Sequence, residues 1–138
     1  MRRFVLDASV ALAWVVDRNA DAYAAEVQQK LNAGDRALVP AFWQLEVTNV
    51  LSMVEKRGVM TAEEVDEGLR YFERFLGTRA EVTSVFSEMR EILRLSRELK
   101  LTSYDALYVD LARREGLALA TLDRRLAEAA EKAGVKRA

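Results

Sequence analysis

The segment that decides the fold stands near the start of the chain and reads Phe4-Val5-Leu6-Asp7-Ala8-Ser9. A short apolar run is typical of a buried strand, and this run ends directly on an acid. The residues that follow favour a short helix, so the segment has the order strand, carboxylate, helix. This order is typical of an α/β protein whose strands run parallel. We therefore expect Asp7 at the carboxyl end of the first strand.

The same alternation continues along the whole chain. We expect strands at residues 4–6, 37–39, 81–83 and 117–121, with a final edge strand at 135–136. We expect helices at residues 10–16, 20–32, 41–57, 61–76, 85–99, 103–115 and 124–133. Strands that alternate with helices indicate an α/β fold in which a parallel sheet is covered on both faces. The length suits a single domain over residues 1–138.

Composition limits the chemistry available to the protein. The 138 residues include no cysteine and no histidine. This excludes disulfides, thiolate nucleophiles, zinc sites built from cysteine or histidine, and Ser-His-Asp arrangements. Acid–base chemistry then falls to carboxylates, lysine, tyrosine or a metal-activated water. The net charge of -1 gives no overall basic surface of the kind typical of nucleic-acid binders.

Neither a membrane span nor a secretion signal is expected. The longest apolar stretch, residues 10–16, is far too short to cross a bilayer. The charged start resembles the beginning of a signal peptide, but Asp7 interrupts the apolar run at once. We expect a cytoplasmic protein without membrane contact.

Four carboxylates stand in apolar surroundings: Asp7, Glu46, Asp105 and Asp123. A buried charge is costly unless it is paired, hydrogen-bonded or bound to a metal. Asp7 and Asp123 both follow a predicted strand, and ligands of parallel sheets bind beyond the carboxyl ends of the strands. Hard cations prefer oxygen ligands, so the acids predict a site for Mg²⁺ or Mn²⁺.

Three of the four acids also have a simpler interpretation as helix caps. Asp7, Asp105 and Asp123 each stand where a helix begins, so each could be a capping residue. Glu46 has no such explanation, because the helical period places it inside an apolar stripe. Asp110 falls on the polar face of its helix, and we interpret it as ordinary surface.

Polar neighbours could support the acids. Three short polar side chains are positioned to orient them by hydrogen bonds: Ser9, Asn49 and Thr121. Two adjacent arginines, Arg124 and Arg125, could contact phosphates at the rim of the site. We interpret Trp14, Trp43 and Tyr108 as core residues and not as base-stacking surfaces.

At these residues the chain resembles the PIN-domain ribonucleases, specifically the VapC-like toxins of toxin–antitoxin pairs. The matching stretches are residues 4–9, Pro40 with residues 46–51, residues 103–108 and residues 120–123. Their order and spacing follow the family from one end of the chain to the other. Asp110 is an additional acid that the family pattern does not lead us to expect.

The resemblance implies a three-layer α/β/α fold around a central, mostly parallel sheet of four to five strands. It implies endonucleolytic cleavage of RNA that depends on Mg²⁺ or Mn²⁺. The metal ligands would be Asp7, Glu46, Asp105 and Asp123, supported by Ser9, Asn49 and Thr121. It also implies a homodimer, and a cognate antitoxin that lies along the cleft and is gripped by the helix pair at residues 41–76.

Two other functions stay open at the level of sequence. The chain could be a non-catalytic α/β binding module whose acids are caps and salt-bridge partners. It could also be a Mg²⁺-dependent phosphatase, although such enzymes place a second aspartate two residues after the nucleophile, where this chain has Ser9. Saturable Mn²⁺ binding that depends on Asp7 separates the nuclease from the binding module.

Overall fold

The central element is a four-stranded parallel sheet with the strand order β3-β2-β1-β4. The computed structural model describes residues 1–16, 19 and 21–138. The strands are β1 (Arg3–Leu6), β2 (Arg36–Pro40), β3 (Ala80–Thr83) and β4 (Leu119–Ala120). Val5 in β1 pairs with Leu38 on one side and with Leu119 on the other. The prediction of a parallel sheet of four to five strands is confirmed.

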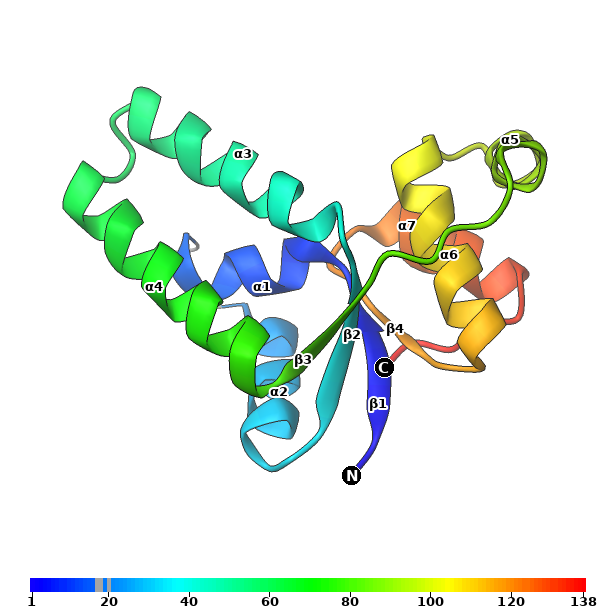
Figure 1. Cartoon of the computed structure of the whole chain (residues 1–138), viewed down its shortest axis with the longest axis horizontal. Coiled ribbons are helices and arrows are strands. Elements are labelled where there is room, and N and C mark those ends of the chain that lie inside the picture. Colours follow the sequence, from blue (N-terminus) through cyan, green and yellow to red (C-terminus); the bar gives the residue numbers. More distant parts are fainter. Residues whose placement is uncertain (17–18, 20) are drawn as a thin grey trace.

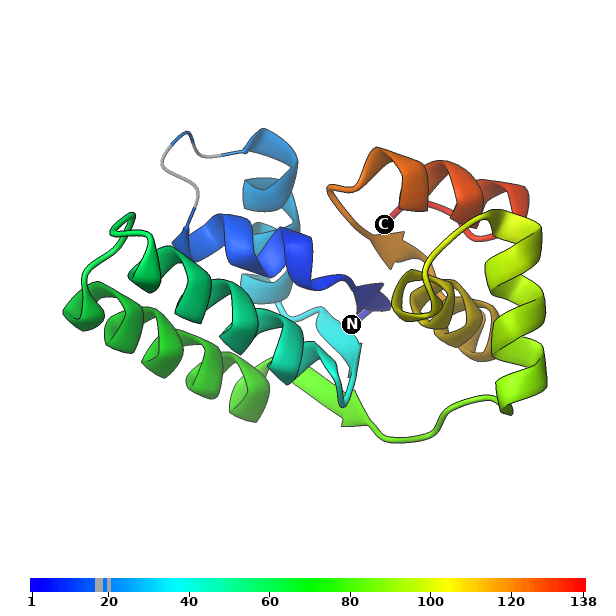
Figure 2. The ribbon, with the colours of Figure 1, turned by 90° about the horizontal axis from the view of Figure 1, so that it is seen from above.

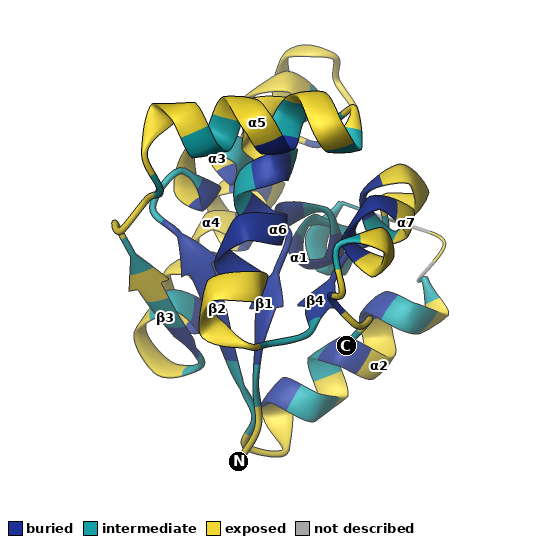
Figure 3. Ribbon diagram, turned by 90° about the vertical axis from the view of Figure 1, so that its right-hand side faces the viewer, coloured by how far each residue is buried: buried dark blue, intermediate teal, exposed yellow. Residues whose placement is uncertain are grey.

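Helices cover both faces of this sheet, which gives three layers (Figures 1 and 2). One face carries α1 (Ala8–Val15), α2 (Ala22–Asn32), α3 (Trp43–Lys56) and α4 (Ala62–Thr78). The other face carries α5 (Met89–Leu99), α6 (Ser103–Glu115) and α7 (Arg124–Lys132). Figure 3 shows α5 and α6 in front of the sheet, with the buried strands behind them. The predicted three-layer α/β/α fold is therefore confirmed.

The core lies on both faces of the sheet and contains the largest aromatic side chains. Trp43 and Tyr108 are fully buried, as predicted, and Trp14 is half-buried. Trp14 donates its indole N–H to the carbonyl oxygen of Ala24 at 2.7 Å. A Cβ on Gly68 would stand 2.6 Å from Cγ1 of Val15, so glycine permits α4 to approach α1 this closely.

Several predicted boundaries differ from the structure. The helix predicted from residue 85 begins at Met89, and the one predicted to end at residue 76 continues to Thr78. The predicted edge strand at 135–136 is reduced to one parallel bridge between Leu119 and Arg137. The helix predicted from Ala20 begins at Ala22, and Ala20 itself lies outside the described residues.

Local sequence signals explain the boundaries that were predicted well. Thr61 and Glu64 form both hydrogen bonds of the capping box that opens α4. Gly116 ends α6 with φ of 65°, a left-handed conformation that glycine adopts without steric cost. None of the described helices combines the length and apolar character needed to cross a membrane.

Candidate active site

Four carboxylates lie at the edge where the strands end. Asp7 directly follows β1, and Asp123 comes shortly after its neighbour β4. Glu46 stands in the first turn of α3 and Asp105 in the first turn of α6. The first turns of these two helices lie above the upper ends of the strands in Figure 1. The fold thus brings acids from four distant segments to one edge.

Asp7 is the most deeply buried of the four, with 6% of its surface exposed. It stands at the N-terminus of α1 but makes no side-chain capping bond to that helix. Its Oδ2 instead accepts hydrogen bonds from the hydroxyls of Ser9 at 2.7 Å and Thr121 at 2.6 Å. Those two hydroxyl oxygens accept backbone N–H groups of Leu122 and Asp123, which orients them toward Asp7.

Glu46 is half-buried, and a hydrogen bond joins it to the helical layer on the other face of the sheet. Its Oε1 accepts a hydrogen bond of 2.5 Å from the hydroxyl of Tyr108 on α6. The sequence prediction took Tyr108 for a core residue only. Its ring is indeed buried, but the hydroxyl is a polar group that the site uses, and a buried tyrosine usually needs such a partner.

Asp105 and Asp123 are more accessible than Asp7. The N–H of Asp105 donates to Oγ1 of Thr102, which caps α6. Asp123 caps α7, because its Oδ1 accepts the N–H groups of Arg125 at 2.9 Å and Leu126 at 3.2 Å. The capping interpretation is thus correct for Asp123. Both capping bonds fall on one oxygen atom of this carboxylate.

The carboxylates interact electrostatically with one another. Burial raises the pKa of Asp7, against the hydrogen bonds from Thr121 and Ser9, and the charge of Asp123 adds to the increase. Burial raises the pKa of Glu46, and the charges of Asp7 and Asp105 raise it further.

The pKa of Asp105 is raised by burial and then by the charges of Asp7 and Asp123, which outweigh the opposite effect of Arg125. Charge–charge repulsion therefore links all four acids.

The donor set suits a hard divalent cation, since it consists of carboxylate oxygens. In the described part of the chain, however, no three such side chains form a group that could hold a metal ion as they stand. Repulsion among like charges favours such separation in the absence of a cation. Binding of one ion by several of these acids therefore requires side-chain movement.

The remaining predicted site residues lie at the rim. Asn49 is exposed one turn after Glu46, and its amide donates to Sδ of Met53 at 3.9 Å. Arg124 and Arg125 are exposed at the start of α7. Arg125 donates to the carbonyl oxygen of Lys100 at 3.3 Å. The structure brings Ser9 and Thr121 to Asp7 but does not bond Asn49 to an acid.

The interpretation of Asp110 as ordinary surface is wrong. Only 6% of Asp110 is exposed. Its Oδ2 accepts hydrogen bonds from Oγ of Ser87 at 2.6 Å and from Nε of Arg114 at 2.9 Å. Asp110 and Arg114 stand one turn apart on the same face of α6. The residues before α5 cover that face, and a helical projection cannot include that tertiary contact.

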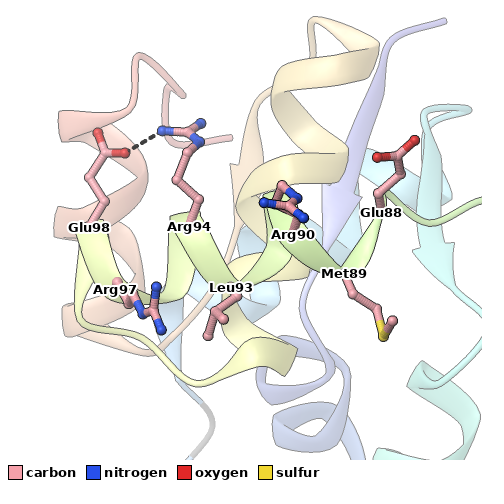
Figure 4. A pocket seen from close by; sticks show the side chains of 7 residues that line it. All are labelled: Glu88, Met89, Arg90, Leu93, Arg94, Arg97 and Glu98. Atoms are coloured by element: carbon pink, nitrogen blue, oxygen red, sulfur yellow. Dashed lines mark hydrogen bonds and ion pairs between the residues drawn. The ribbon is translucent and has the colours of Figure 1, made fainter.

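One hollow on the surface is separate from the acids. It measures about 1010 Å³, runs along α5 and is lined by residues between Glu88 and Glu98. Figure 4 shows Met89 and Leu93 directed away from the ion pair between Arg94 and Glu98. None of the four carboxylates lines this hollow.

The fold and the four acids define a class of protein: a parallel α/β domain with carboxylates gathered beyond the ends of its strands. The PIN domain family matches residues 4–132, and the chain belongs to this family. The resemblance inferred from the sequence is confirmed.

Curated relatives carry ribonuclease names. The chain is 36% identical to Ribonuclease VapC3 of Mycobacterium tuberculosis over 93 residues, which cover 65% of this chain and 62% of that protein. It is 32% identical to Ribonuclease VapC9 of the same organism over 124 residues, which cover 90% of this chain and 88% of that protein. The match to VapC3 thus spans less than two thirds of that relative's length.

Solved structures share the fold at low sequence identity. PAE2754 from Pyrobaculum aerophilum superposes with a TM-score of 0.69 at 22% identity, covering 93% of this chain and 84% of that one. FitAcB from Neisseria gonorrhoeae superposes with a TM-score of 0.65 at 13% identity, covering 97% and 95%. At these identities the likeness concerns the fold alone.

Proposed function

We propose that the protein is an endoribonuclease that hydrolyses RNA phosphodiester bonds with the help of Mg²⁺ or Mn²⁺. The observation that carries this proposal is the meeting of four carboxylates at one edge of the sheet, where their charges help to raise the pKa of Asp7, Glu46 and Asp105. Membership of the PIN family and the ribonuclease names of the relatives support it.

The four acids Asp7, Glu46, Asp105 and Asp123 would hold the cation. A divalent ion bound there would activate water and stabilise negative charge on the phosphate oxygens. The chain's own contribution is positioning. Ser9 and Thr121 hold Asp7, and Tyr108 holds Glu46 toward the opposite layer. Arg124 and Arg125 at the rim would contact the phosphates of the RNA.

The two other functions fit the geometry less well. A phosphatase needs a second carboxylate where Ser9 stands, and Ser9 donates its hydroxyl to Asp7. A non-catalytic module would use its acids as caps. That explains Asp123, but the carboxylates of Asp7 and Glu46 accept hydrogen bonds from hydroxyl groups. We therefore favour the nuclease.

The partners follow from the VapC-like resemblance and are part of the same proposal. The protein would be the cytoplasmic toxin of a toxin–antitoxin pair. The helical hairpin of α3 and α4, which projects beside the sheet in Figure 1, would contact the antitoxin. A homodimer would bury the exposed apolar side chains near α5, where Val85, Met89 and Leu93 are 64%, 87% and 47% exposed.

Cleavage of a mixed RNA pool tests the activity. We expect cutting with Mg²⁺ or Mn²⁺, none with EDTA, and a loss of cutting in Glu46→Gln. Glu73→Gln, which removes an exposed acid from α4, is the matched control and should cut like the wild type. Equal cutting in every sample would point to a contaminant. No cutting together with no saturable Mn²⁺ binding would favour the binding module.

A further inference from the structure

A hollow of about 500 Å³ opens beside two of the carboxylates. Its lining has an acidic side, with Glu46 and Asp105, and an aromatic side, with Phe42 and Tyr104. Apolar walls with a few well-placed polar groups are typical of ligand sites. A molecule that reaches these acids through the hollow therefore passes along aromatic rings.

The ring of Phe42 contacts Tyr104, which also lines the hollow, and Phe86, which lies beside it. We call these three rings the aromatic platform: Phe42, Phe86 and Tyr104. The ring of Phe42 lies 5.5 Å from that of Tyr104, edge-on, and 6.1 Å from that of Phe86. Tyr104 is 60% exposed and Phe86 46% exposed. The platform thus presents ring surface to solvent at the entrance to the acids.

Hydrogen bonds to side chains of α6 hold the segment that carries Phe86. Phe86 lies in the segment between β3 and α5, and its two neighbours in the chain each form a hydrogen bond with a side chain of α6. Ser87 donates to the buried carboxylate of Asp110 at 2.6 Å, and Arg114 donates to the carbonyl oxygen of Val85 at 3.3 Å. Arg114 and Asp110 also pair with each other at 2.9 Å. This clamp gives the buried Asp110 a positioning role.

The geometry points to the aromatic platform as a stacking surface for an unpaired nucleobase of RNA, adjacent to the phosphodiester that is cut. This inference rests on the proposed ribonuclease activity. Protein aromatic rings stack on splayed-out bases of single-stranded RNA, whereas paired bases keep their faces inside the helix. The carboxylates with their cation would take the phosphate, and the rings beside them would take the base.

The platform therefore selects single-stranded RNA and has a residue that can be changed safely. Tyr104 is exposed, so its replacement removes little from the core. Tyr104→Phe keeps the ring, whereas Tyr104→Leu keeps an apolar side chain without an aromatic face. The pair separates stacking from simple apolar contact. Val82→Ala, at an exposed position of the edge strand β3, is a control that leaves the platform intact.

The first measurement is steady-state cleavage of an unstructured RNA oligonucleotide. We expect Tyr104→Leu to raise KM about tenfold with kcat within twofold of wild type, because one base loses its stacking partner. Tyr104→Phe and Val82→Ala should behave like wild type. Ser87→Ala, which loosens Phe86, should raise KM less than Tyr104→Leu does, with kcat again unchanged.

The second measurement detects stacking without cleavage. Oligouridine RNA that carries 2-aminopurine at one position, scanned along the strand, is titrated with the Glu46→Gln variant. We expect Glu46→Gln to quench the fluorescence at one position. The quenching should remain when Tyr104→Phe is added to this variant and should disappear when Tyr104→Leu is added.

The outcomes separate the two proposals. If the wild type cuts RNA but Tyr104→Leu has an unchanged KM and still quenches 2-aminopurine, the stacking inference is overturned and the ribonuclease proposal stands. If no RNA is cut with any divalent ion, the ribonuclease proposal fails. In that case, quenching that depends on the ring of Tyr104 would still support base stacking on the platform. If no such quenching is seen, the stacking inference is overturned as well.

Discussion

Asp7 and Asp110 are equally buried, each with 6% of its surface exposed, yet their surroundings differ in charge. Asp110 pairs with the guanidinium of Arg114 and with the hydroxyl of Ser87. The carboxylate of Asp7 accepts hydrogen bonds from two uncharged hydroxyls, and its pKa is raised by burial and by the charge of Asp123. Burial alone therefore does not separate these two aspartates. The charge of the partners does.

The largest expected difference between these two aspartates is in catalysis. Asp7→Asn should lower metal-dependent RNA cleavage by about 10³-fold, since a lost cation ligand removes several kcal/mol of stabilisation from the transition state. Asp110→Asn should change kcat by less than about threefold, because this carboxylate lies in the clamp and not among the four acids. Single-turnover cleavage rates check both. Equal losses in the two variants would refute the distinction.

The second difference is in stability, where the substitution of Asp110 should be more harmful than that of Asp7. Asp110→Asn should lower the free energy of unfolding by about 2 kcal/mol, because it breaks an ion pair with Arg114 whose carboxylate side is buried. Asp7→Asn, measured in EDTA, should raise it, because the substitution relieves repulsion and keeps an oxygen for both hydroxyls.

Urea denaturation measures both changes. Asp66→Asn, which alters an exposed acid on α4, serves as the control for a simple change of net charge. A lower free energy of unfolding for Asp7→Asn than for the wild type would show that repulsion among the four acids does not destabilise the fold.

The hydroxyls that serve the two aspartates offer a third comparison. Thr121→Val removes the donor to Asp7 with little change of shape and should lower kcat about tenfold, as loss of a supporting partner of a metal ligand typically does. Ser87→Ala removes the donor to Asp110 and should leave kcat unchanged. The measurement is kcat at saturating RNA and metal. An unchanged kcat in Thr121→Val would make its bond to Asp7 merely structural.

The smallest effect concerns pH. A carboxylate whose pKa is raised by folding binds protons more readily in the folded state, so its contribution to stability falls as pH rises from its ordinary pKa through the raised one. In EDTA, Asp7→Asn should therefore exceed the wild type in Tm at pH 7.5, and the gap should narrow at pH 5. Thermal melts at both values test this. A gap that is independent of pH would contradict the raised pKa of Asp7.

Local patterns in the chain predicted most of the fold. The run before Asp7 predicts β1, the capping box at Thr61 predicts the start of α4, and Gly116 predicts the end of α6, because each depends on neighbours within a few residues. The start of α5 was predicted too early. Residues 85–88 make their contacts with α6 and the end of β3 and do not continue the helix.

The candidate site divides in the same way. The four acids could be identified because carboxylates among apolar residues stand out in any sequence. The hydrogen bond of Tyr108, the burial of Asp110 and the exposure of Tyr104 could not be predicted, since each depends on how distant segments pack. Helical periodicity gives the direction of a side chain but not what lies opposite it.

The amino-acid order by itself determined the alternation of strands and helices, the parallel sheet and the set of acids that end beside it. These follow from periodicity and from the cost of burying charge, both of which act locally. Only the packed structure decided that Asp110 is buried by the residues before α5 and that Asp7 meets acids from other segments. Both depend on segments that pack together across the fold, so no local pattern contains them.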